Sequence, residues 1–397
     1  MLNTQFSAWP SFTKEESEKV SEVLLSNKVN YWTGIEGREF EKEFAEYTDS
    51  KYAVAVANGT IALDLALVAL NVGSANGGNS TDEVIVTSRT FLASASSIVT
   101  AGAKPAFADI DVNSQNVTAE TITSVITPNT KAIICVHLAG MPCEMDEIMS
   151  LANNHGIKVI EDCAQAHGAK YKGRSVGSIG HIGAWSFCQD KIMTTGGEGG
   201  MVTTSDDTLW KKMWSYKDHG KSWDSIYNKE HPPGFRWLHD SFGTNWRLTE
   251  MQSAIGRIQI KRMPKWFEAR NNNADKIKRV LSKFKLIRLV EIPSYIEHAQ
   301  YKYYAFIKRE LLSDGWSRDR IVDEINLLGV PCFQGSCSEV YLEKAFDGTN
   351  FRPEKRLVNS VELGETSLMF LVHPTLTETE IVKTCEIIEV VLNQASS

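Results

Sequence analysis

A regular alternation of short apolar segments with helical segments constrains the fold of this chain more than any other feature. The apolar segments are typical of buried strands and cover residues 52–57, 83–87, 105–110, 131–137 and 157–160. Helix-forming stretches separate them, notably 61–70 and 145–153. Strands that alternate with helices usually form a parallel sheet, because each crossover helix packs on a sheet face. The alternation therefore predicts a doubly wound α/β domain.

A second, smaller domain is expected in the C-terminal third. A chain of 397 residues is long for one hydrophobic core, and beyond about residue 265 the pattern changes to α+β. We expect a large domain over residues 1–260 and a small domain over 261–397 that closes over the site. The tryptophan-rich stretch 205–240 predicts a long irregular functional loop rather than a linker. Helices are also expected at 13–27, where Thr13 and Glu16 form a capping-box pattern, and at 39–47.

Composition excludes several classes of protein. The formal net charge of −7 argues against general nucleic-acid binding. No apolar run approaches the roughly 20 residues that span a bilayer, and the first ten residues do not resemble a secretory signal. The seven cysteines include no Cys-x-x-Cys pair, and several lie in apolar strand patterns. We therefore expect a cytoplasmic protein without a metal site.

The candidate chemistry centres on Lys191. This lysine lies between a short apolar strand pattern and the glycine cluster 196–200. Apolar neighbours reduce the hydration of a lysine and favour its neutral amine, which forms Schiff bases with carbonyl cofactors. A lone lysine in a glycine-rich hairpin is more often a surface residue. Other motifs in the chain must therefore show whether Lys191 is a functional residue.

Two further stretches supply such partners. Asp162 ends an apolar strand, and a carboxylate at the carboxyl edge of a parallel sheet lies where α/β proteins bind ligands. Pyridoxal phosphate needs an acid beside its ring nitrogen, although an acid at a strand end is also a common helix cap. Gln165 could bond the ring hydroxyl. The Asn58-Gly59-Thr60 turn joins a strand to a helix start, which is a site for a phosphate.

These stretches together resemble a known family. The run from Glu161-Asp-x-Ala-Gln through Ser186-Phe-x-x-x-Lys191 to Gly197-Glu-Gly-Gly200 is similar to the DegT/DnrJ/EryC1/StrS family of nucleotide-sugar aminotransferases. The similarity extends over residues 40–373. It implies a pyridoxal-phosphate-dependent transferase of the aspartate aminotransferase type (fold type I), with a mostly parallel seven-stranded sheet. It also implies pyridoxal 5′-phosphate as cofactor, converted to pyridoxamine 5′-phosphate in the half-reaction.

The resemblance assigns roles by residue. Lys191 and Asp162 are implied to be catalytic. The implied cofactor-binding residues are Gly59, Thr60, Phe91, Asp162, Gln165, Ser186, Lys191 and Asn245. Asn245 would reach the cofactor phosphate of the other subunit of a homodimer, although it could instead be a helix cap.

Other positions are less specific. Substrate contacts are predicted at Tyr31, Trp32 and His219, although packing at a subunit contact explains the two aromatic residues equally well. Phe91 would stack on the cofactor ring, with a core phenylalanine as the alternative. His137 is predicted to be structural. Ala139 replaces a tyrosine of the family pattern, which places any role of that tyrosine in doubt.

The implied reaction moves an amino group from L-glutamate, which becomes 2-oxoglutarate, to a nucleotide-linked keto-deoxysugar for surface-polysaccharide or related biosynthesis. Our first choice is C-4 of a UDP-4-keto-6-deoxy-2-acetamido sugar; amination at C-3 and dTDP- or GDP-linked sugars are alternatives. A sugar 3-dehydratase would carry histidine at the lysine position, which Lys191 argues against. A non-catalytic regulator of the same fold is a further alternative, disfavoured because Asp162, Gln165 and Lys191 occur together.

Overall fold

The computed structural model of the chain describes residues 6–231, 234 and 236–396. Met1 to Gln5, on which the expectation about a secretory signal partly rests, lie outside the described residues. Among those described, no helix has the length and apolar character needed to cross a bilayer.

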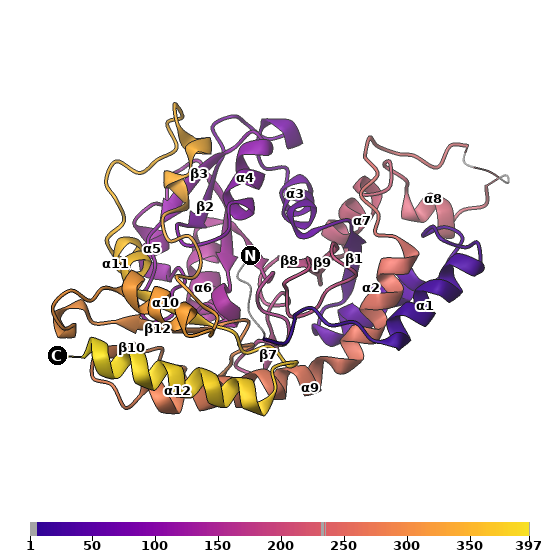
Figure 1. Cartoon of the computed structure of the whole chain (residues 1–397). Helices are drawn as coiled ribbons and strands as arrows, with labels where there is room; N and C mark the ends of the chain where they lie inside the picture. The colour runs from indigo at the N-terminus through magenta and orange to yellow at the C-terminus, as the bar shows by residue number, and fades with distance from the viewer. Residues whose placement is uncertain (1–5, 232–233, 235, 397) are drawn as a thin grey trace.

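A seven-stranded sheet forms the central layer of the molecule (Figure 1). Its strand order is β1-β9-β8-β5-β4-β2-β3. Neighbouring strands from β8 to β3 run parallel, whereas β9 is antiparallel to both β1 and β8. The mostly parallel sheet is therefore confirmed. The strands are β1 (Tyr52–Val56), β2 (Glu83–Thr87), β3 (Lys104–Ala108), β4 (Thr130–Val136), β5 (Lys158–Asp162), β8 (Ile182–Ser186) and β9 (Gly200–Thr204).

Helices cover both faces of this sheet, because successive side chains of a strand point to opposite sides. On β4, Ile134 packs toward the helices α3, α4 and α7, while Ile133 and Cys135 pack toward α5 and α6. Nearly all of these strand residues are buried, as expected for a parallel sheet covered on both sides. The helices are α3 (Gly59–Ala69), α4 (Ala93–Thr100), α5 (Ala119–Thr123), α6 (Met145–His155) and α7 (Asp207–Tyr216).

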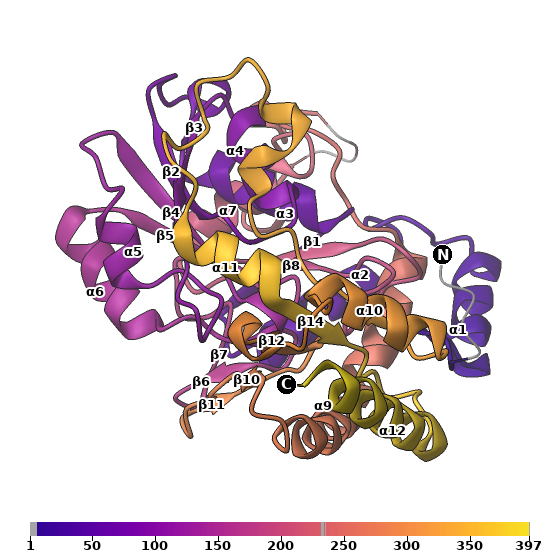
Figure 2. The same ribbon diagram turned by 60° about the vertical axis from the view of Figure 1, so that its left-hand side comes forward.

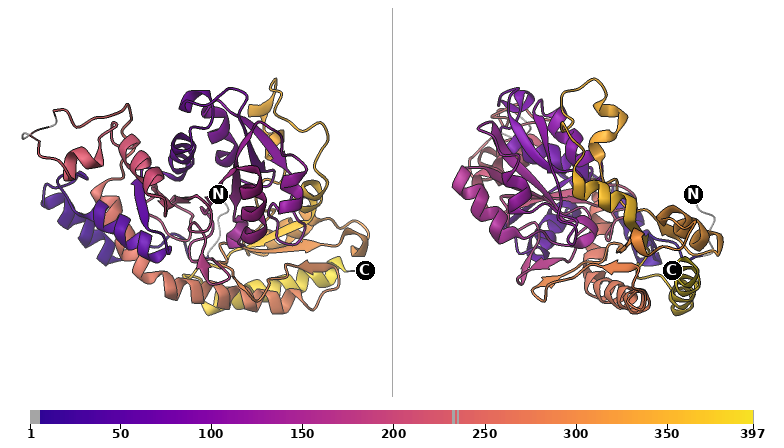
Figure 3. Two further views of the ribbon diagram at one scale, coloured as in Figure 1. Left: turned by 180° about the vertical axis from the view of Figure 1, so that it is seen from behind. Right: turned by 90° about the vertical axis from the view of Figure 1, so that its left-hand side faces the viewer.

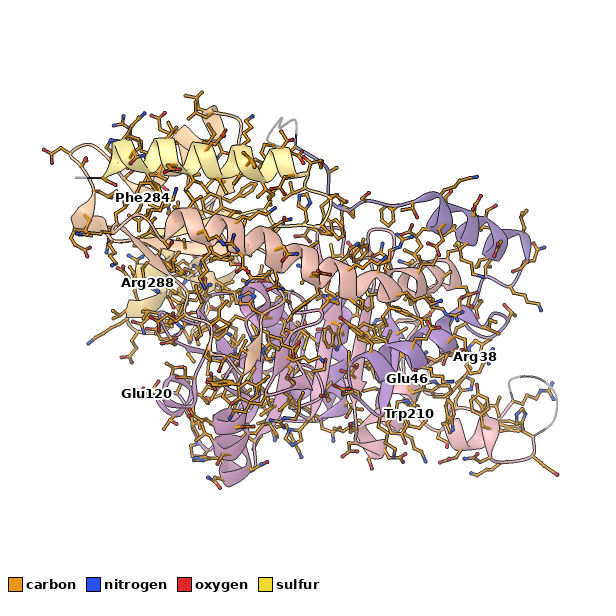
Figure 4. All side chains as sticks on the ribbon, turned by 90° about the horizontal axis from the view of Figure 1, so that it is seen from below. Arg38, Glu46, Glu120, Trp210, Phe284 and Arg288 are labelled. Carbon is orange, nitrogen blue, oxygen red and sulfur yellow. The ribbon has the colours of Figure 1, made fainter. Side chains whose placement is uncertain are left out.

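The stretch predicted as an irregular loop at 205–240 is partly helical, so that prediction was wrong for residues 207–216 and 223–227. It contains α7 and α8 (Trp223–Tyr227). The Asp206 side chain caps α7 by accepting hydrogen bonds from the backbone N–H groups of Thr208 and Leu209. Trp210, labelled in Figure 4, stacks on Tyr52 of β1 with ring centroids 4.2 Å apart. The tryptophans therefore anchor a helix. Positions 232, 233 and 235 of this stretch lie outside the described residues.

The C-terminal third forms a separate four-stranded antiparallel sheet in the order β10-β12-β14-β13, as expected for an α+β unit. A short third sheet has the order β11-β6-β7, in which β6 pairs with both of its neighbours. The strands are β6 (Lys170–Tyr171), β7 (Arg174–Ser175), β10 (Ile287–Leu289), β11 (Ile296–Glu297), β12 (Tyr303–Ile307), β13 (Cys332–Phe333) and β14 (Ser367–Phe370). The accompanying helices are α10 (Arg318–Leu327), α11 (Val358–Thr366) and α12 (Glu378–Ala395).

The two parts of the chain are joined by one long helix. Helix α9 (Glu250–Leu281) begins on the large sheet and runs without a break into the small unit, where it lies beside α12 (Figure 4). Its first half packs on α1 (Lys14–Leu25) and α2 (Glu36–Tyr47), and its last turns belong to the core of the small unit. The predicted boundary at 260/261 therefore falls inside a helix.

Two further segments cross between the parts. Residues 340–346 leave the small unit and pack in the core of the large one, where they rise beside α4 and β3 (Figures 2 and 3). Residues 6–10, which we call the N-terminal strap, contact α12 and the residues before it: Ser7 Oγ donates to Glu380 Oε2 over 3.0 Å, and Thr375 Oγ1 donates to the Ala8 carbonyl over 2.8 Å. The capping box predicted for Thr13 and Glu16 is present at the start of α1.

Candidate active site

A cavity of about 1140 Å³ opens at the carboxyl edge of the large sheet, beside the small unit. The ends of β4, β5 and β8 reach it through Val136, Asp162 and Ser186. The small unit contributes the opposite wall, including Tyr301, Lys302 and residues 335–337. This is the edge at which open α/β sheets bind ligands.

Lys191 lies in the cavity wall, and three groups hold it. Its side chain is 16% exposed, with the Nζ atom 3.7 Å from Asp190 Oδ1 and 5.3 Å from the ring centroid of Tyr301. Tyr301 donates its hydroxyl to Asp190, so the carboxylate beside the lysine is itself fixed. The backbone carbonyl of Lys191 accepts a 2.8 Å hydrogen bond from the indole N–H of Trp9. The amine therefore faces the cavity from a fixed backbone.

Asp162 is buried at the end of β5 and lines the same cavity. Ser94 Oγ donates to its Oδ2 over 2.8 Å, and the backbone N–H of Ala164 donates to its Oδ1 over 3.1 Å. Burial raises the pKa of this carboxyl, and these hydrogen bonds and the charge of Lys191 oppose the rise only in part. No salt bridge to Asp162 occurs within the described part of the chain, so a cation in the cavity is what would stabilise its charged form.

The predicted phosphate-binding turn lies at another part of the same wall. Asn58 caps α3 by accepting from the Ile61 N–H, so the helix begins at Gly59 with its first N–H groups toward the cavity. A Cβ atom at Gly59 would lie 2.5 Å from Cβ of Ser186, so only glycine allows this close approach. Thr60 and Ser186 supply hydroxyl groups to the same wall. Free N–H groups, a helix start and hydroxyls form a site suited to a phosphate.

Phe91 and Gln165 also line the cavity, as the sequence predicted. Phe91 is 71% exposed and is therefore not the core phenylalanine of the alternative reading. Gln165 Oε1 accepts a 2.8 Å hydrogen bond from the Ala139 N–H. This contact uses the backbone of Ala139 and so tolerates the loss of the family tyrosine, while the Gln165 side chain stays beside Asp162.

Four predicted residues are not part of the cavity wall of a single chain: Tyr31, Trp32, His219 and Asn245. Tyr31 is 3% exposed, and its hydroxyl donates to Glu41 and accepts from the indole of Trp214. These contacts lie within one chain, so the alternative of packing at a subunit contact also stays a prediction for Tyr31 and Trp32. The burial of Tyr31 gives its substrate role no support, and the role stays a prediction.

Asn245 and His219 lie on neighbouring backbone segments. Asp218 forms a β-bridge with Asn245, and the N–H of His219 donates to the Thr244 carbonyl over 3.0 Å. The Asp218 carboxylate accepts a 2.6 Å hydrogen bond from Arg247 Nη1. Asn245 precedes α9, which Thr249 caps instead, so Asn245 is not the helix cap that its alternative reading required.

His137 is structural, as expected. Its Nε2 lies 2.9 Å from Glu161 Oε2, and its Nδ1 accepts from the Cys143 N–H. Glu161 also accepts three backbone N–H groups, from Gly177, Ile179 and Gly180. His137, Glu161 and Cys163 lie close enough to suggest a metal site, yet both histidine nitrogens and the carboxylate are already engaged in hydrogen bonds.

Sequence reasoning missed Trp9, Ser94, Tyr301 and Lys302, all of which contact Lys191 or Asp162 or line the cavity. None lies in a motif of its own. A strand-like pattern beginning at Tyr303 was visible, but nothing in it indicated that the two residues before it face the cavity.

The described residues fit pyridoxal phosphate. The cavity brings together an amine, a buried carboxylate without a cationic partner, an exposed aromatic ring and a helix start with hydroxyl groups. These match the aldehyde, the ring nitrogen, the ring face and the phosphate of that cofactor, in that order.

Comparison with known proteins agrees with this assignment. Residues 10–389 match the model of the DegT/DnrJ/EryC1/StrS aminotransferase family. A GDP-perosamine synthase of Escherichia coli O157:H7 is 41% identical over 270 residues, which cover 67% of this chain and 68% of that one. A UDP-N-acetyl-3-dehydro-α-D-glucosamine 3-aminotransferase of Acidithiobacillus ferrooxidans is 40% identical over 250 residues, 63% of each chain.

A solved structure is similar over nearly the whole length. The aminotransferase from Psychrobacter cryohalolentis superposes with a TM-score of 0.95 at 60% identity and covers 98% of this chain and 99% of that one. The predicted fold, enzyme class and cofactor are thereby confirmed. The chain belongs to the DegT/DnrJ/EryC1/StrS family of pyridoxal-phosphate-dependent aminotransferases.

Proposed function

We propose that this enzyme transfers the amino group of L-glutamate to a nucleotide-linked keto-deoxysugar. The observation that carries the proposal is the convergence of Lys191, Asp162 and the Gly59–Thr60 turn on one cavity. That cavity is large enough for a sugar in addition to the cofactor, since its volume of about 1140 Å³ exceeds the range typical of small-ligand pockets.

The residues divide the chemistry between them. When bound, the cofactor supplies an electron sink that stabilises negative charge at the reacting carbon. Asp162 keeps the ring nitrogen protonated, and its burial makes the pairing with that cation strong. Lys191 holds the cofactor and, as a free amine, carries the proton of the donor Cα as general base and acid. Gly59, Thr60 and Ser186 bind the phosphate, Phe91 stacks on the ring and Gln165 bonds its hydroxyl.

We further propose that the active unit is a homodimer with shared sites. Asn245 is exposed and lies outside the cavity of its own chain, on the same segment as Phe242, which is 98% exposed. A large apolar side chain so exposed beside a polar amide suits a surface that a second copy covers. In this arrangement Asn245 binds the cofactor phosphate of the other subunit, and His219, Tyr31 and Trp32 lie near the sugar.

The acceptor remains C-4 of a UDP-4-keto-6-deoxy-2-acetamido sugar in our proposal. Two relatives widen the set of candidates: one is named a GDP-perosamine synthase, and the other is named a 3-aminotransferase of a UDP-linked sugar. A GDP-linked keto-deoxysugar is therefore the second candidate, and position C-3 the second site of amination.

Turnover against a panel tests the proposal. The purified enzyme is incubated with L-glutamate and UDP-, GDP- or dTDP-linked keto sugars, 2-oxoglutarate is quantified, and NMR assigns the aminated carbon. We expect one sugar to give a specificity constant at least tenfold above the others. Formation of no 2-oxoglutarate with any nucleotide-linked sugar would contradict the proposed acceptor class.

A further inference from the structure

The cavity wall carries more charge than the assigned roles use. The charged residues that line it are Asp162, Asp190, Lys191, Glu198, Lys302 and Glu343. Lys191 and Lys302 are the cations of this set, and Lys191 is committed to the cofactor. Lys302 is therefore the cation that the described wall offers to a substrate.

Lys302 stands close to the reacting amine. It directly follows Tyr301, and its Nζ atom lies 5.0 Å from the centroid of the Tyr301 ring. The Nζ atom of Lys191 lies 5.3 Å from the same centroid, so both amines lie near one aromatic ring. Because the Tyr301 hydroxyl is bonded to Asp190, this ring is held in place.

Among the described residues, no carboxylate forms a salt bridge with Lys302. The acid that acts on it, Asp190, is already engaged by Lys191 and Tyr301. Burial lowers the pKa of Lys302 to about 8, and the nearby cations Arg270 and Lys191 act in the same direction. A half-buried ammonium group without a counter-charge is costly, and binding an anion relieves that cost.

The chemistry of the reaction indicates which anion. The α-carboxylate of an amino-acid donor is one bond from the carbon whose amino group Lys191 helps to transfer. The diphosphate of a nucleotide sugar is separated from the acceptor carbon by the sugar ring. A cation beside Lys191 therefore matches the donor carboxylate better than the acceptor diphosphate.

We infer that Lys302 binds the α-carboxylate of the amino-acid donor and so orients its Cα–N bond toward Lys191. The inference rests on the proposed transamination: in its first half-reaction, Lys302 would select an amino acid as the donor. The same lysine would release the carboxylate when the keto acid leaves and would not contact the nucleotide.

Three variants test this inference: Lys302→Met, which removes the charge but keeps the length of the stem; Lys302→Arg, which restores a cation; and the control Lys308→Met, just after the same strand. Single-turnover absorbance with the cofactor-loaded enzyme measures the L-glutamate concentration for the half-maximal rate. We expect Lys302→Met to raise it by about 10- to 100-fold, the range for losing a hydrogen-bonded charge partner. Lys302→Arg should recover most of the loss, and Lys308→Met should match the wild type.

A binding readout separates this inference from the proposed function. Borohydride-reduced enzyme, which cannot turn over, is titrated calorimetrically with glutarate and, separately, with UDP and GDP. Lys302→Met should weaken glutarate binding by a similar factor and leave nucleotide binding unchanged. Unchanged glutarate binding, or a loss confined to the nucleotides, would overturn the inference. A wild type that binds glutarate through Lys302 but aminates no sugar would contradict the proposed acceptor alone.

The unfolding midpoint distinguishes binding from a structural role. A lysine retained for stability would lower the midpoint when replaced by methionine. An uncompensated ammonium group should not, so we expect Lys302→Met to unfold at or above the wild-type temperature. A lowered midpoint together with unchanged glutarate binding would make Lys302 a packing residue.

Discussion

At the scale of single residues, the environment of Asp162 suits the role proposed for it, which is to pair with the protonated ring nitrogen of the cofactor. A carboxylate that a salt bridge already neutralised would gain little from a protonated ring nitrogen. Asp162 instead has two neutral donors, Ser94 and the Ala164 N–H, and an otherwise buried setting. The negative charge of Asp162 can therefore be stabilised strongly by a cation bound in the cavity.

Replacing Asp162 by asparagine should abolish most of the rate while the cofactor still binds. The amide keeps the size and one hydrogen bond but loses the charge that holds the ring proton. A few kcal/mol of barrier correspond to a loss of roughly a hundredfold or more in kcat. Steady-state turnover and the absorbance of the bound cofactor measure the two effects separately. Asp64→Asn, in α3 and outside the cavity, is the control; wild-type turnover in Asp162→Asn would mean that another group holds the ring proton.

The buried carboxylate one residue earlier has a structural task. Glu161→Gln should lower the free energy of unfolding by about 3–5 kcal/mol, because an amide cannot accept from His137 and three backbone N–H groups at once. Urea denaturation measures this, with the exposed Glu147→Gln as control. An equal stability of Glu161→Gln and wild type would show that the network relaxes around the amide.

The contact between Glu161 and His137 also makes the free energy of unfolding depend on pH, in a direction that can be predicted. Burial alone would raise the pKa of Glu161, but the hydrogen bonds and charge of His137 and the backbone N–H groups outweigh it and lower the pKa below 4.5. Its stabilising contribution is therefore complete above about pH 4.5 and is lost as the pH falls through the lower native value. The difference in free energy of unfolding between wild type and Glu161→Gln should become smaller in that acidic range. A difference that becomes larger there would contradict the lowered pKa of Glu161.

At the scale of elements, sequence and structure agree where local patterns decide. The expected strand at 83–87 is β2 without change, because its β-branched residues favour a strand over a helix. Lys191 and Asp162 could be predicted as candidates because each lies in a short, specific sequence motif. The helix α7 was missed because its tryptophans suggested a loop, although Asp206 is a recognisable cap.

Contacts between distant segments had no such signal. Trp9 meets the backbone of Lys191 across 182 positions of sequence, and its ring packs edge-on against Trp266 at 5.1 Å. The course of α9 through Pro264 was equally hidden, because an interior proline usually marks a helix end. In both cases tertiary packing decides, and packing cannot be read from a local window.

Trp9→Phe tests the N-terminal strap as an element. Phenylalanine keeps an aromatic ring but removes the N–H that binds the Lys191 carbonyl. We expect the free energy of unfolding to fall by about 1–2 kcal/mol and amide exchange in residues 187–195 to become faster. Mass-spectrometric hydrogen exchange measures the local effect. Trp266→Phe is the matched control, and equal exchange in both variants would mean that ring packing, rather than the hydrogen bond, holds the lysine.

At the scale of the whole molecule, the cavity belongs to both parts of the chain. The large unit supplies Asp162 and Lys191, the proposed catalytic pair, and the small unit supplies Tyr301 and Lys302. Helix α9 and the segment 340–346 connect the same two parts, so the wall residues from each are held by shared elements.

Mixing two inactive variants tests the proposed dimer. Lys191→Ala lacks the catalytic amine, and Asn245→Asp sets a carboxylate against the phosphate. If sites are shared, a mixed dimer has one site with both lesions and one with neither, which returns up to about half the wild-type activity per mixed dimer. Each variant alone must be inactive, and native mass spectrometry must confirm subunit exchange. No recovery after confirmed exchange would mean that Asn245 serves its own chain.

The N-terminal strap also has a consequence for folding during translation. Ser7 bonds to Glu380, which lies 373 positions later in the chain, and the carbonyl of Ala8 accepts its hydrogen bond from Thr375. On the ribosome, residues 6–10 therefore leave the exit tunnel long before the segment that holds them has been translated. The large sheet can assemble meanwhile, but the strap that carries Trp9 to the carbonyl of Lys191 docks only after α12 has emerged. Lys191 of a nascent chain, the proposed catalytic lysine, thus acquires its hydrogen bond from Trp9 only at the end of synthesis.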